Sequence, residues 1–455
     1  MDTVFTFEGA LQKGRAEDMG GVFEERLNAV DASDPATIIY TSGTTATPKA
    51  VILSHYNFIS NVRQIREDFQ DFLSEKDLFL SFLPLSHVLE RTAGYYLPVI
   101  VGSKVAFAED FSKLQDNLVE IRPTFIISVP RLYEKIHAGI LSKVEDQASF
   151  FKKMLVKWAI RVASANLPYM CRRVQRRGWF ALKYRLAERL VFSKLKQALG
   201  LNRIRGAVSG GGPLSVSDGV FFLGMGILVL EGYGLTETSP VTHVNRPWLI
   251  KPGTVGPPLR DTMVKFSEQG EIFIRGPQVM EGYYKDEAAT REAFTEDGFF
   301  MSGDIGKADE DGYLSITGRI KDVIITSGGK NIAPQPIENS LRGSRFIEHV
   351  SILGDRRKYL TALVIPAFDE LKQWVQKKAI VFRDNAELIQ DTQVIGLYEK
   401  EIEALTNQFS RVEKIKKFRL LDTEWSQQTL ELTPTLKIKR RVIEEKYRTI
   451  IDEMY

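Results

Sequence analysis

A short apolar run that ends in a loop of hydroxyl residues most constrains the fold of this chain. Residues 36–41 (ATIIYT) predict a buried strand, and the sequence TSGTTATPK follows over residues 41–49. The pattern over residues 51–66 then predicts a helix. A strand that leads through a loop into a helix is the repeating unit of an α/β sheet packed between helices.

The rest of the chain extends this pattern and then departs from it. Residues 131–200 predict a long helical region, and residues 336–455 predict a small separate α+β domain with strands at 349–354 and 360–366. Further strands are predicted at 78–83, 97–107, 124–129, 203–209, 226–230, 262–266, 271–275 and 313–317. The predicted fold class is therefore α/β, with a large multi-sheet domain and a small α+β domain at the C-terminus.

Composition places the chain among ordinary globular proteins with more than one domain. Its 455 residues are too many for one compact core, and 44% hydrophobic with 26% charged residues argues against extensive disorder. A single cysteine, Cys171, allows no internal disulfide, so we expect a reduced, cytosolic setting. The sequence has no signal-peptide pattern and no apolar run long enough to predict a membrane span.

Positive charge is concentrated in one segment, although the net charge is only +3. Residues 151–200 contain thirteen Lys or Arg, one acidic residue, Glu188, and several interleaved aromatic residues. Such a segment suits peripheral contact with an anionic membrane or another polyanionic ligand. A solvated helical face is the alternative, and we expect no nucleic-acid partner.

The loop of residues 41–49 has the groups of a polyphosphate site. It combines hydroxyls, backbone N–H groups next to a glycine, and Lys49. It is not a Walker loop, because Lys49 lies between Pro48 and Ala50 instead of following a glycine and preceding Ser or Thr. Taken alone, a surface turn rich in Ser and Thr explains the loop equally well.

Two later motifs contain groups that suit a nucleotide. Residues 232–238 (GYGLTET) combine Tyr233, which can stack on a base, with Glu237, which can hold Mg²⁺ against phosphate oxygens. Asp304 and Arg319 can form hydrogen bonds with the hydroxyls of a ribose. Each signal is weak alone, because a buried acid or a surface salt bridge usually explains such residues.

Together these motifs resemble the adenylate-forming superfamily of acyl-CoA synthetases, adenylation domains and luciferases, from about residue 36 to the C-terminus. The resemblance implies an adenylation domain, residues 1–320, and a mobile C-terminal lid domain, residues 321–455, with a hinge near Lys321. It implies ATP, Mg²⁺, coenzyme A and a fatty acid as ligands. The residues that it assigns to the nucleotide and coenzyme A are Thr41, Ser42, Gly43, Thr44, Thr45, Lys49, Gly210, Gly211, Gly212, Tyr233, Gly234, Asp304, Arg319, Lys321, Gly329 and Lys330.

The same resemblance assigns catalytic roles. Lys437 matches the family's adenylation lysine, whose ammonium would offset the charge that develops as a carboxylate attacks the α-phosphorus. Thr236 and Glu237 would serve the phosphates and Mg²⁺, with Thr44 as a second metal ligand. His87 would lie near the entering carboxylate, although a histidine that only orders its own loop is an equally good interpretation.

The segments around His87, Lys321 and Lys437 resemble long-chain acyl-CoA synthetases more than acetyl or aryl members. We therefore expect a long-chain fatty acid to be converted to acyl-AMP and then to its coenzyme A thioester, with release of pyrophosphate and AMP. A ligase that uses a carrier protein, or a catalytically impaired module that binds fatty acid or nucleotide, is the alternative. A serine hydrolase is not favoured, because the sequence has no Gly-x-Ser-x-Gly elbow.

The chain departs from the family pattern in two places. Ala46 and Ala50 stand where glycines are usual, which would weaken ATP binding if either position needs a positive φ. Only 40 residues precede Thr41, where family members have a whole subdomain. We therefore expect a large domain shortened at its N-terminus, with exposed apolar sheet or helix faces.

Overall fold

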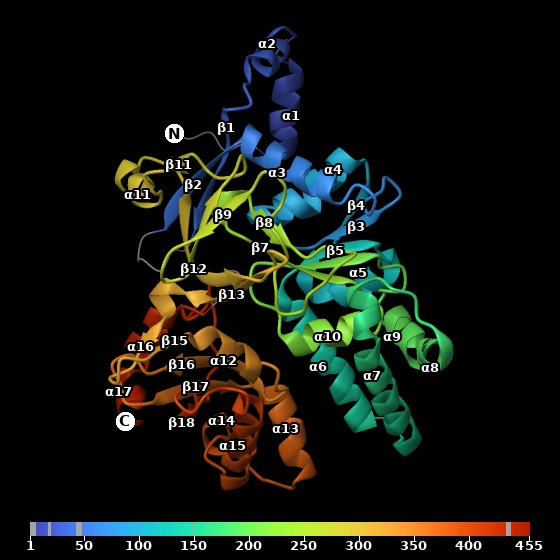
Figure 1. Cartoon of the computed structure of the whole chain (residues 1–455), viewed down its shortest axis with the longest axis vertical. Coiled ribbons are helices and arrows are strands. Elements are labelled where there is room, and N and C mark those ends of the chain that lie inside the picture. The colour runs from blue at the N-terminus through green and yellow to red at the C-terminus, as the bar shows by residue number, and fades with distance from the viewer. Residues whose placement is uncertain (1–5, 17–19, 42–47, 148, 434–437) are drawn as a thin grey trace.

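The computed structural model describes residues 6–16, 20–41, 48–147, 149–433 and 438–455, and Figure 1 shows their arrangement. Helices α1 (Phe7–Ala16) and α2 (Val22–Ala29) form one end of the molecule and bury none of their residues. A large α/β part follows, and the C-terminal domain lies at the opposite end. The predicted α/β class, with several sheets and a small C-terminal domain, is confirmed.

A six-stranded sheet forms the centre of the large part. Its first five strands are parallel and the last pair is antiparallel, in the order β4 (Lys104–Phe107), β3 (Leu78–Ser81), β5 (Phe125–Ser128), β6 (Gly206–Ser209), β7 (Val229–Gly234) and β8 (Val241–Val244). All four residues of β5 (FIIS) are buried. Such continuous apolar runs are typical of parallel strands with helices on both faces.

Two helical layers cover this sheet, because successive side chains of a strand point to opposite faces. One layer packs on the face that carries Leu80 and Ile126, and consists of α5 (Leu114–Ile121), α6 (Pro130–Gln147), α7 (Phe150–Cys171), α8 (Gly178–Ala187), α9 (Ser193–Ala198) and α10 (Val216–Gly224). The other packs on the face of Phe79 and Ile127, and consists of α3 (His55–Asp68), the π-helix η1 (Glu90–Tyr96) and α4 (Leu97–Val101). The helical region predicted at 131–200 is thus confirmed.

The first predicted unit differs from the expected strand, loop and helix. Residues 49–54 form a strand, β2 (Lys49–Ser54), which pairs antiparallel with β1 (Pro35–Thr41), and the helix begins only at His55. Ser54 caps this helix through a hydrogen bond from the backbone N–H of Asn57, 3.2 Å long, which fixes its start. The predicted burial of β1 is also wrong, because all its residues are exposed or half-buried.

A four-stranded antiparallel sheet completes the large part, in the order β13 (Leu314–Arg319), β12 (Phe300–Ala308), β10 (Glu271–Arg275) and β9 (Met263–Phe266). A short strand, β11 (Gly282–Tyr283), joins the β1–β2 pair, and α11 (Glu287–Glu292) follows it. The predicted strands at 262–266, 271–275 and 313–317 are confirmed, whereas β8 and β12 are additional.

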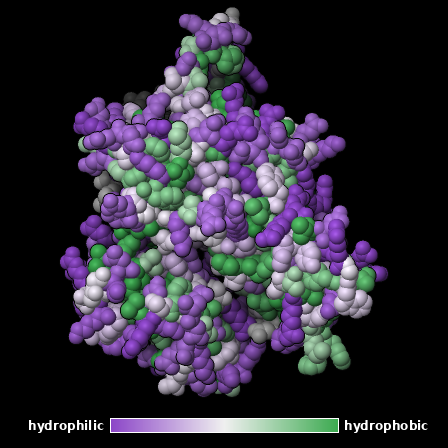
Figure 2. All heavy atoms as spheres, in the orientation of Figure 1, coloured by the Kyte–Doolittle hydropathy of each residue, from purple (hydrophilic) through white to green (hydrophobic). Residues whose placement is uncertain are grey.

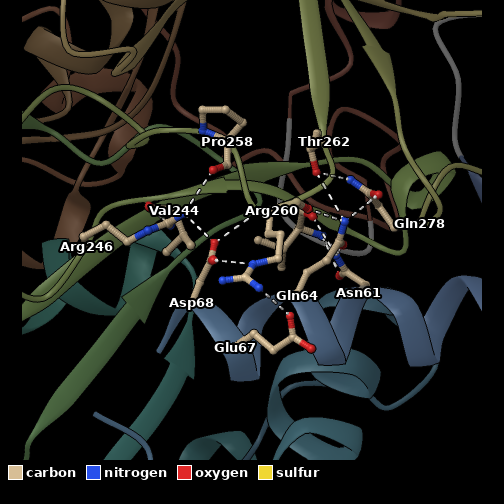
Figure 3. A network of polar contacts seen from close by, with 11 residues as sticks. Asn61, Gln64, Glu67, Asp68, Val244, Arg246, Pro258, Arg260, Thr262 and Gln278 are labelled. Carbon is tan, nitrogen blue, oxygen red and sulfur yellow. Dashed lines mark hydrogen bonds and ion pairs between the residues drawn. The ribbon is translucent and has the colours of Figure 1, made fainter. Parts of the chain in front are cut away.

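Helix α3 is tied to β8 and to the segment between β8 and β9 by a network of polar side chains (Figure 3). The Asn61 amide donates to the Val241 carbonyl over 2.7 Å, and the Gln64 amide donates to the Arg260 carbonyl over 2.7 Å. Asp68, at the end of the helix, accepts from Arg246 over 2.6 Å. These bonds hold the strand that follows the GYGLTET motif against the helix that follows the loop of residues 41–49.

The C-terminal domain is built on a sheet of β16 (Ile347–Leu353), β17 (Leu360–Pro366) and β18 (Ile415–Leu420). Every residue of β17 is buried, because helices cover both faces of the sheet. On one face lie α12 (Pro334–Leu341), α13 (Phe368–Lys377), α14 (Asn385–Leu388) and α15 (Thr392–Thr406), and on the other α16 (Arg440–Lys446) and α17 (Arg448–Asp452). The predicted strands at 349–354 and 360–366 are confirmed.

The surface carries the exposed apolar side chains expected near the N-terminal part. Tyr40 of β1 is 71% exposed, and Tyr56 and Ile59 of α3 are 51% and 39% exposed. Ala50, one of the two altered positions, lies in strand β2 with an ordinary negative φ, so no strain arises there. Ala46 lies outside the described residues. Across the described part of the chain, none of the helices is sufficiently long and apolar to traverse a bilayer.

Candidate active site

A cavity of about 3220 Å³ extends between the large part and the C-terminal domain. Figure 2 shows the surface hollowed in this region. Of the residues predicted for a site, it is lined by Thr41, Lys49, His87, Gly210, Gly211, Gly212, Tyr233, Gly234, Thr236, Glu237, Asp304, Arg319 and Lys321. The fold therefore brings together motifs that lie up to 280 residues apart in the sequence.

Asp304 is the buried centre of a polar triad in the cavity wall. The Tyr233 hydroxyl donates to Oδ2 of Asp304 over 2.7 Å, and Arg319 Nε donates to Oδ1 over 2.8 Å. Asp304 and Arg319 are partners across the β12–β13 ladder, so strand register alone places them opposite each other. Burial, with the neighbouring Asp304 carboxylate, raises the pKa of Tyr233 well above its usual range, so the hydroxyl remains a donor.

Glu237 presents a half-buried carboxylate from the same motif. It lies in a single turn of 3₁₀ helix, Thr236–Thr238, and its Oε1 accepts from the Tyr283 hydroxyl over 3.0 Å. Burial raises the pKa of Glu237, although the hydrogen bond from Tyr283 and the charge of Arg319 oppose this change. Lys49 Nζ lies 4.6 Å from the centre of the Tyr283 ring. The Glu237 carboxylate and the Lys49 ammonium thus both contact the Tyr283 side chain.

This donor set suits a metal held partly by a substrate. Among the residues that the structure describes, no three His, Cys, Asp or Glu side chains form a group that could hold a metal ion by themselves. Mg²⁺ usually binds through one or two carboxylates together with substrate phosphates and water. Glu237 fits that mode, whereas Thr44, the second predicted metal ligand, lies outside the described residues.

Two glycine motifs shape the backbone of the cavity. Gly211, in the turn after β6, has a φ of +76°, which a residue with a Cβ rarely adopts. Gly234 has no room for a side chain, because a Cβ there would lie 1.6 Å from the Pro240 carbonyl oxygen. The GYGLTET motif therefore needs its second glycine for close backbone contact.

His87 lines the cavity and also orders its own loop. Its Nδ1 accepts a hydrogen bond from the Leu89 backbone N–H over 3.2 Å, and the His87 backbone N–H donates to the Pro84 carbonyl over 2.9 Å. Nδ1 is therefore the acceptor nitrogen in this tautomer. This position is compatible both with a role near the entering carboxylate and with a role in ordering the loop.

One wall of the cavity is apolar. Phe125 stacks on Phe79 with ring centres 5.1 Å apart and meets Phe72 edge to face at 5.4 Å. The same wall includes Ile65, Phe69, Leu73, Leu97, Ile127 and Val244. Aromatic and aliphatic side chains of this kind suit a hydrocarbon chain, because they gain nothing from contact with water.

The C-terminal domain contributes fewer of the predicted residues. Lys321 is exposed and lines the cavity, whereas Gly329 and Lys330 lie in an exposed turn between β14 (Ile324–Ile325) and β15 (Asn331–Ile332) that does not line it. Lys437 lies outside the described residues, as do the predicted loop residues Ser42, Gly43, Thr44 and Thr45. Contacts across the two domains include an ion pair between Arg131 and Glu348.

Two side chains of the cavity wall have no counterpart in the sequence-based prediction. Tyr283 contacts both Glu237 and Lys49, and Glu231 lies within β7, where burial raises its pKa to about 8. The Glu231 carboxylate accepts a long bond, 3.3 Å, from the Gly253 backbone N–H. Glu231 directly precedes the GYGLTET motif, so extending that motif by one residue would have found it, whereas no local pattern distinguishes Tyr283.

Comparisons with known proteins agree with this site. The AMP-binding enzyme family matches residues 3–284, and the C-terminal domain of AMP-binding enzymes matches residues 321–455. The chain is 36% identical over 434 residues to the long-chain-fatty-acid–CoA ligase FadD15 of Mycobacterium bovis, covering 94% of this chain and 71% of that protein. It is 34% identical to the long-chain-fatty-acid–CoA ligase ACSBG2 of Gallus gallus, covering 92% and 58%.

Solved structures show the same fold at lower identity. The adenylation domain of a carboxylate reductase from Mycobacterium chelonae superposes with a TM-score of 0.69 at 20% identity, covering 93% of this chain and 60% of that one. O-succinylbenzoate coenzyme A synthetase from Bacillus subtilis, in complex with ATP and magnesium, gives 0.61 at 22% identity, covering 90% and 70%. The chain therefore belongs to the AMP-binding enzyme family, within the adenylate-forming superfamily that includes fatty acyl-CoA synthetases.

Proposed function

We propose that this protein is an AMP-forming long-chain fatty acid–CoA ligase. One observation carries the proposal: a single cavity combines a nucleotide-type polar site, centred on Asp304 and Glu237, with a wall of phenylalanine and aliphatic side chains. The identity to proteins named long-chain-fatty-acid–CoA ligases supports this choice over shorter acyl substrates.

In the first half-reaction, a fatty acid carboxylate oxygen attacks the α-phosphorus of ATP, and pyrophosphate leaves. Asp304 accepts hydrogen bonds from the ribose hydroxyls, and Tyr233 lies beside the adenine. Glu237, with Thr44 and Thr236, would hold the metal and the phosphates, and Mg²⁺ bound there would neutralise phosphate charge. Lys437 offsets the negative charge that develops between carboxylate and phosphate.

In the second half-reaction, the thiol of coenzyme A attacks the acyl carbonyl, loses its proton, and displaces AMP. The C-terminal domain turns about Lys321 between the two steps, which withdraws Lys437 and brings the loop of Gly329 and Lys330 to the site. Separating the steps in this way excludes water from the adenylate and then admits the thiol.

Pyrophosphate release from Mg·ATP tests the proposal. We expect release by the purified chain to require palmitate, and to fall by at least about a hundredfold in Lys437→Ala. Lys439→Ala, in the same basic segment, is the matched control. Acyl transfer to free coenzyme A distinguishes the proposed ligase from one that uses a carrier protein. ATP binding without any pyrophosphate release would instead favour a binding module.

We further propose that α7 and α8 contact an anionic membrane, from which the enzyme takes its substrate. The lower right end of Figure 2, where α6 passes into α7, carries hydrophobic side chains. Phe150 and Phe151 are 70% and 79% exposed there, and Trp179 of α8 is 71% exposed, within the basic segment of residues 151–200. Exposed aromatic and basic side chains together favour the interface of an anionic bilayer.

Sedimentation with phosphatidylglycerol vesicles tests the membrane proposal. We expect a variant with Phe150→Ser, Phe151→Ser and Lys152→Gln to lose most of its binding, and Phe23→Ser, an equally exposed site on acidic α2, to retain it. Arg176 is a poor target, because it donates to Asn166 over 2.6 Å and packs on the ring of Tyr184. Unchanged binding by the triple variant would refute this contact.

A further inference from the structure

Tyr283 is the one side chain that touches both halves of the proposed phosphate and metal site, as far as the described residues show. Its hydroxyl donates to Glu237 Oε1 over 3.0 Å, and its ring lies 4.6 Å from Lys49 Nζ. Glu237 follows β7, whereas Lys49 ends the loop of residues 41–49 and is the first residue of β2. In the described part of the chain, Tyr283 is thus the side chain that connects these two residues.

The backbone fixes Tyr283 in this position. Tyr283 pairs with Val51 in the short β11–β2 ladder, and its N–H donates to the Thr290 hydroxyl over 2.9 Å. The next residue extends the ladder, because the Tyr284 N–H donates to the Ala50 carbonyl over 2.8 Å. The Met280 N–H donates to the Glu237 carbonyl over 2.8 Å, which ties the same segment to the turn that carries Glu237.

We infer that Tyr283 is a positioning residue for the Mg·ATP site, which orients the Glu237 carboxylate through its hydroxyl and the Lys49 ammonium through its ring. The inference rests on the proposed function, because it assumes that Glu237 and Lys49 bind the metal and the phosphates. Tyr283 itself needs no contact with the nucleotide.

The Tyr283 hydroxyl distinguishes the proposed positioning role from a role in core packing alone. The Tyr283 ring is 8% exposed and belongs to an apolar cluster with Val51 and Met280, so a core residue could fill the same volume. A core role needs only the ring. A positioning role also needs the hydroxyl, because it is the one side-chain donor to Glu237 that the described contacts include.

The ring has a second use, because a lysine above an aromatic face is attracted to it. Lys49 carries its charge at the end of a flexible chain, and contact with Tyr283 limits the positions that its ammonium can occupy. Phenylalanine would keep this contact and lose the hydroxyl, whereas leucine would lose both.

Nucleotide binding by the whole chain, measured by calorimetry without fatty acid, tests the inference. We expect Tyr283→Phe to weaken binding of Mg·ATP about tenfold while binding of AMP without metal changes less than about twofold, because a hydrogen bond to a charged group is lost only on the metal side. We expect Tyr283→Leu to weaken Mg·ATP binding further, since the contact with Lys49 is lost as well.

Tyr284 provides a matched control. It is the next residue, is 44% exposed, and has Lys285 Nζ 5.1 Å from its ring centre, but it does not line the cavity. We expect Tyr284→Phe and Tyr284→Leu to leave both affinities unchanged.

Three outcomes would overturn the inference. Mg·ATP binding by Tyr283→Phe equal to that of the wild type would refute the positioning role alone. A parallel loss of Mg·ATP and AMP binding, together with a lower melting temperature, would make Tyr283 a structural core residue. If the wild type binds neither nucleotide, the proposed function fails as well.

Discussion

Replacing Glu90 by glutamine tests how much an unpaired buried carboxyl destabilises this fold. Glu90 is fully buried at the start of the π-helix η1, and within the described structure neither carboxylate oxygen has a hydrogen-bond partner. Burial raises the pKa of Glu90 to about 7, because no hydrogen bond in the described structure stabilises its charged form.

The sign and size of the effect follow from this pKa. The folded protein holds a proton on Glu90 up to about pH 7, whereas the unfolded chain releases it near the ordinary value of 4.5. The folded state is therefore favoured below pH 4.5, and this contribution is lost as the pH rises through 7. The difference between 4.5 and about 7 corresponds to about 3 kcal/mol, at about 1.36 kcal/mol for each pH unit.

Glutamine has the same shape and carries no charge at any pH. We expect the free energy of unfolding of Glu90→Gln, measured with urea, to exceed that of the wild type by about 3 kcal/mol at pH 8.5 and to approach it at pH 5. Glu120→Gln, at an exposed position of α5, should show no such pH-dependent difference. Parallel stability curves for Glu90→Gln and the wild type would refute the argument.

Three further changes test other parts of the structure. Arg440→Met leaves the buried Glu338 carboxylate without the guanidinium 2.6 Å away, so we expect the C-terminal domain to lose about 3 kcal/mol in urea unfolding, largely recovered by adding Glu338→Gln. Gly256→Ala places a Cβ 2.2 Å from the backbone of β8. Gly298 has a similar positive φ but open surroundings, so Gly298→Ala should lower the free energy of unfolding by only roughly 1 kcal/mol. We expect Gly256→Ala to lower it several times more, as measured by melting curves. Asp304→Asn should weaken ATP binding about tenfold in calorimetry at unchanged melting temperature, because its charge-assisted bonds are weakened.

Short-range patterns predicted most of the fold and much of the site. The buried run FIIS and its parallel neighbours were recognisable because parallel strands are apolar on both faces. Asp304 and Arg319 could be paired in function because they lie in neighbouring motifs, and the structure places them in register on adjacent strands. Where chemistry and strand register coincide in this way, sequence motifs are informative about the site.

The errors arise where one pattern fits two structures. The run VIL at residues 51–53 is apolar enough for a helix or a strand. It forms a strand because it pairs with β1, and no local pattern in the sequence indicates that pairing. Residues 97–107 contain both a helix and a strand, because Gly102 ends α4 in a left-handed conformation with φ of +80°. Tyr283 joins the site through a contact with a residue 46 positions away.

Isotope transfer from the fatty acid to AMP tests the central claim most directly. Palmitate labelled with ¹⁸O in its carboxylate would be incubated with Mg·ATP, coenzyme A and the whole chain, and the AMP analysed by mass spectrometry. Attack of the carboxylate on the α-phosphorus, followed by thiol attack on the carbonyl, leaves one ¹⁸O atom in each AMP, together with palmitoyl-CoA. Thioester formation with unlabelled AMP, or with ADP and phosphate as products, would contradict an acyl-adenylate route.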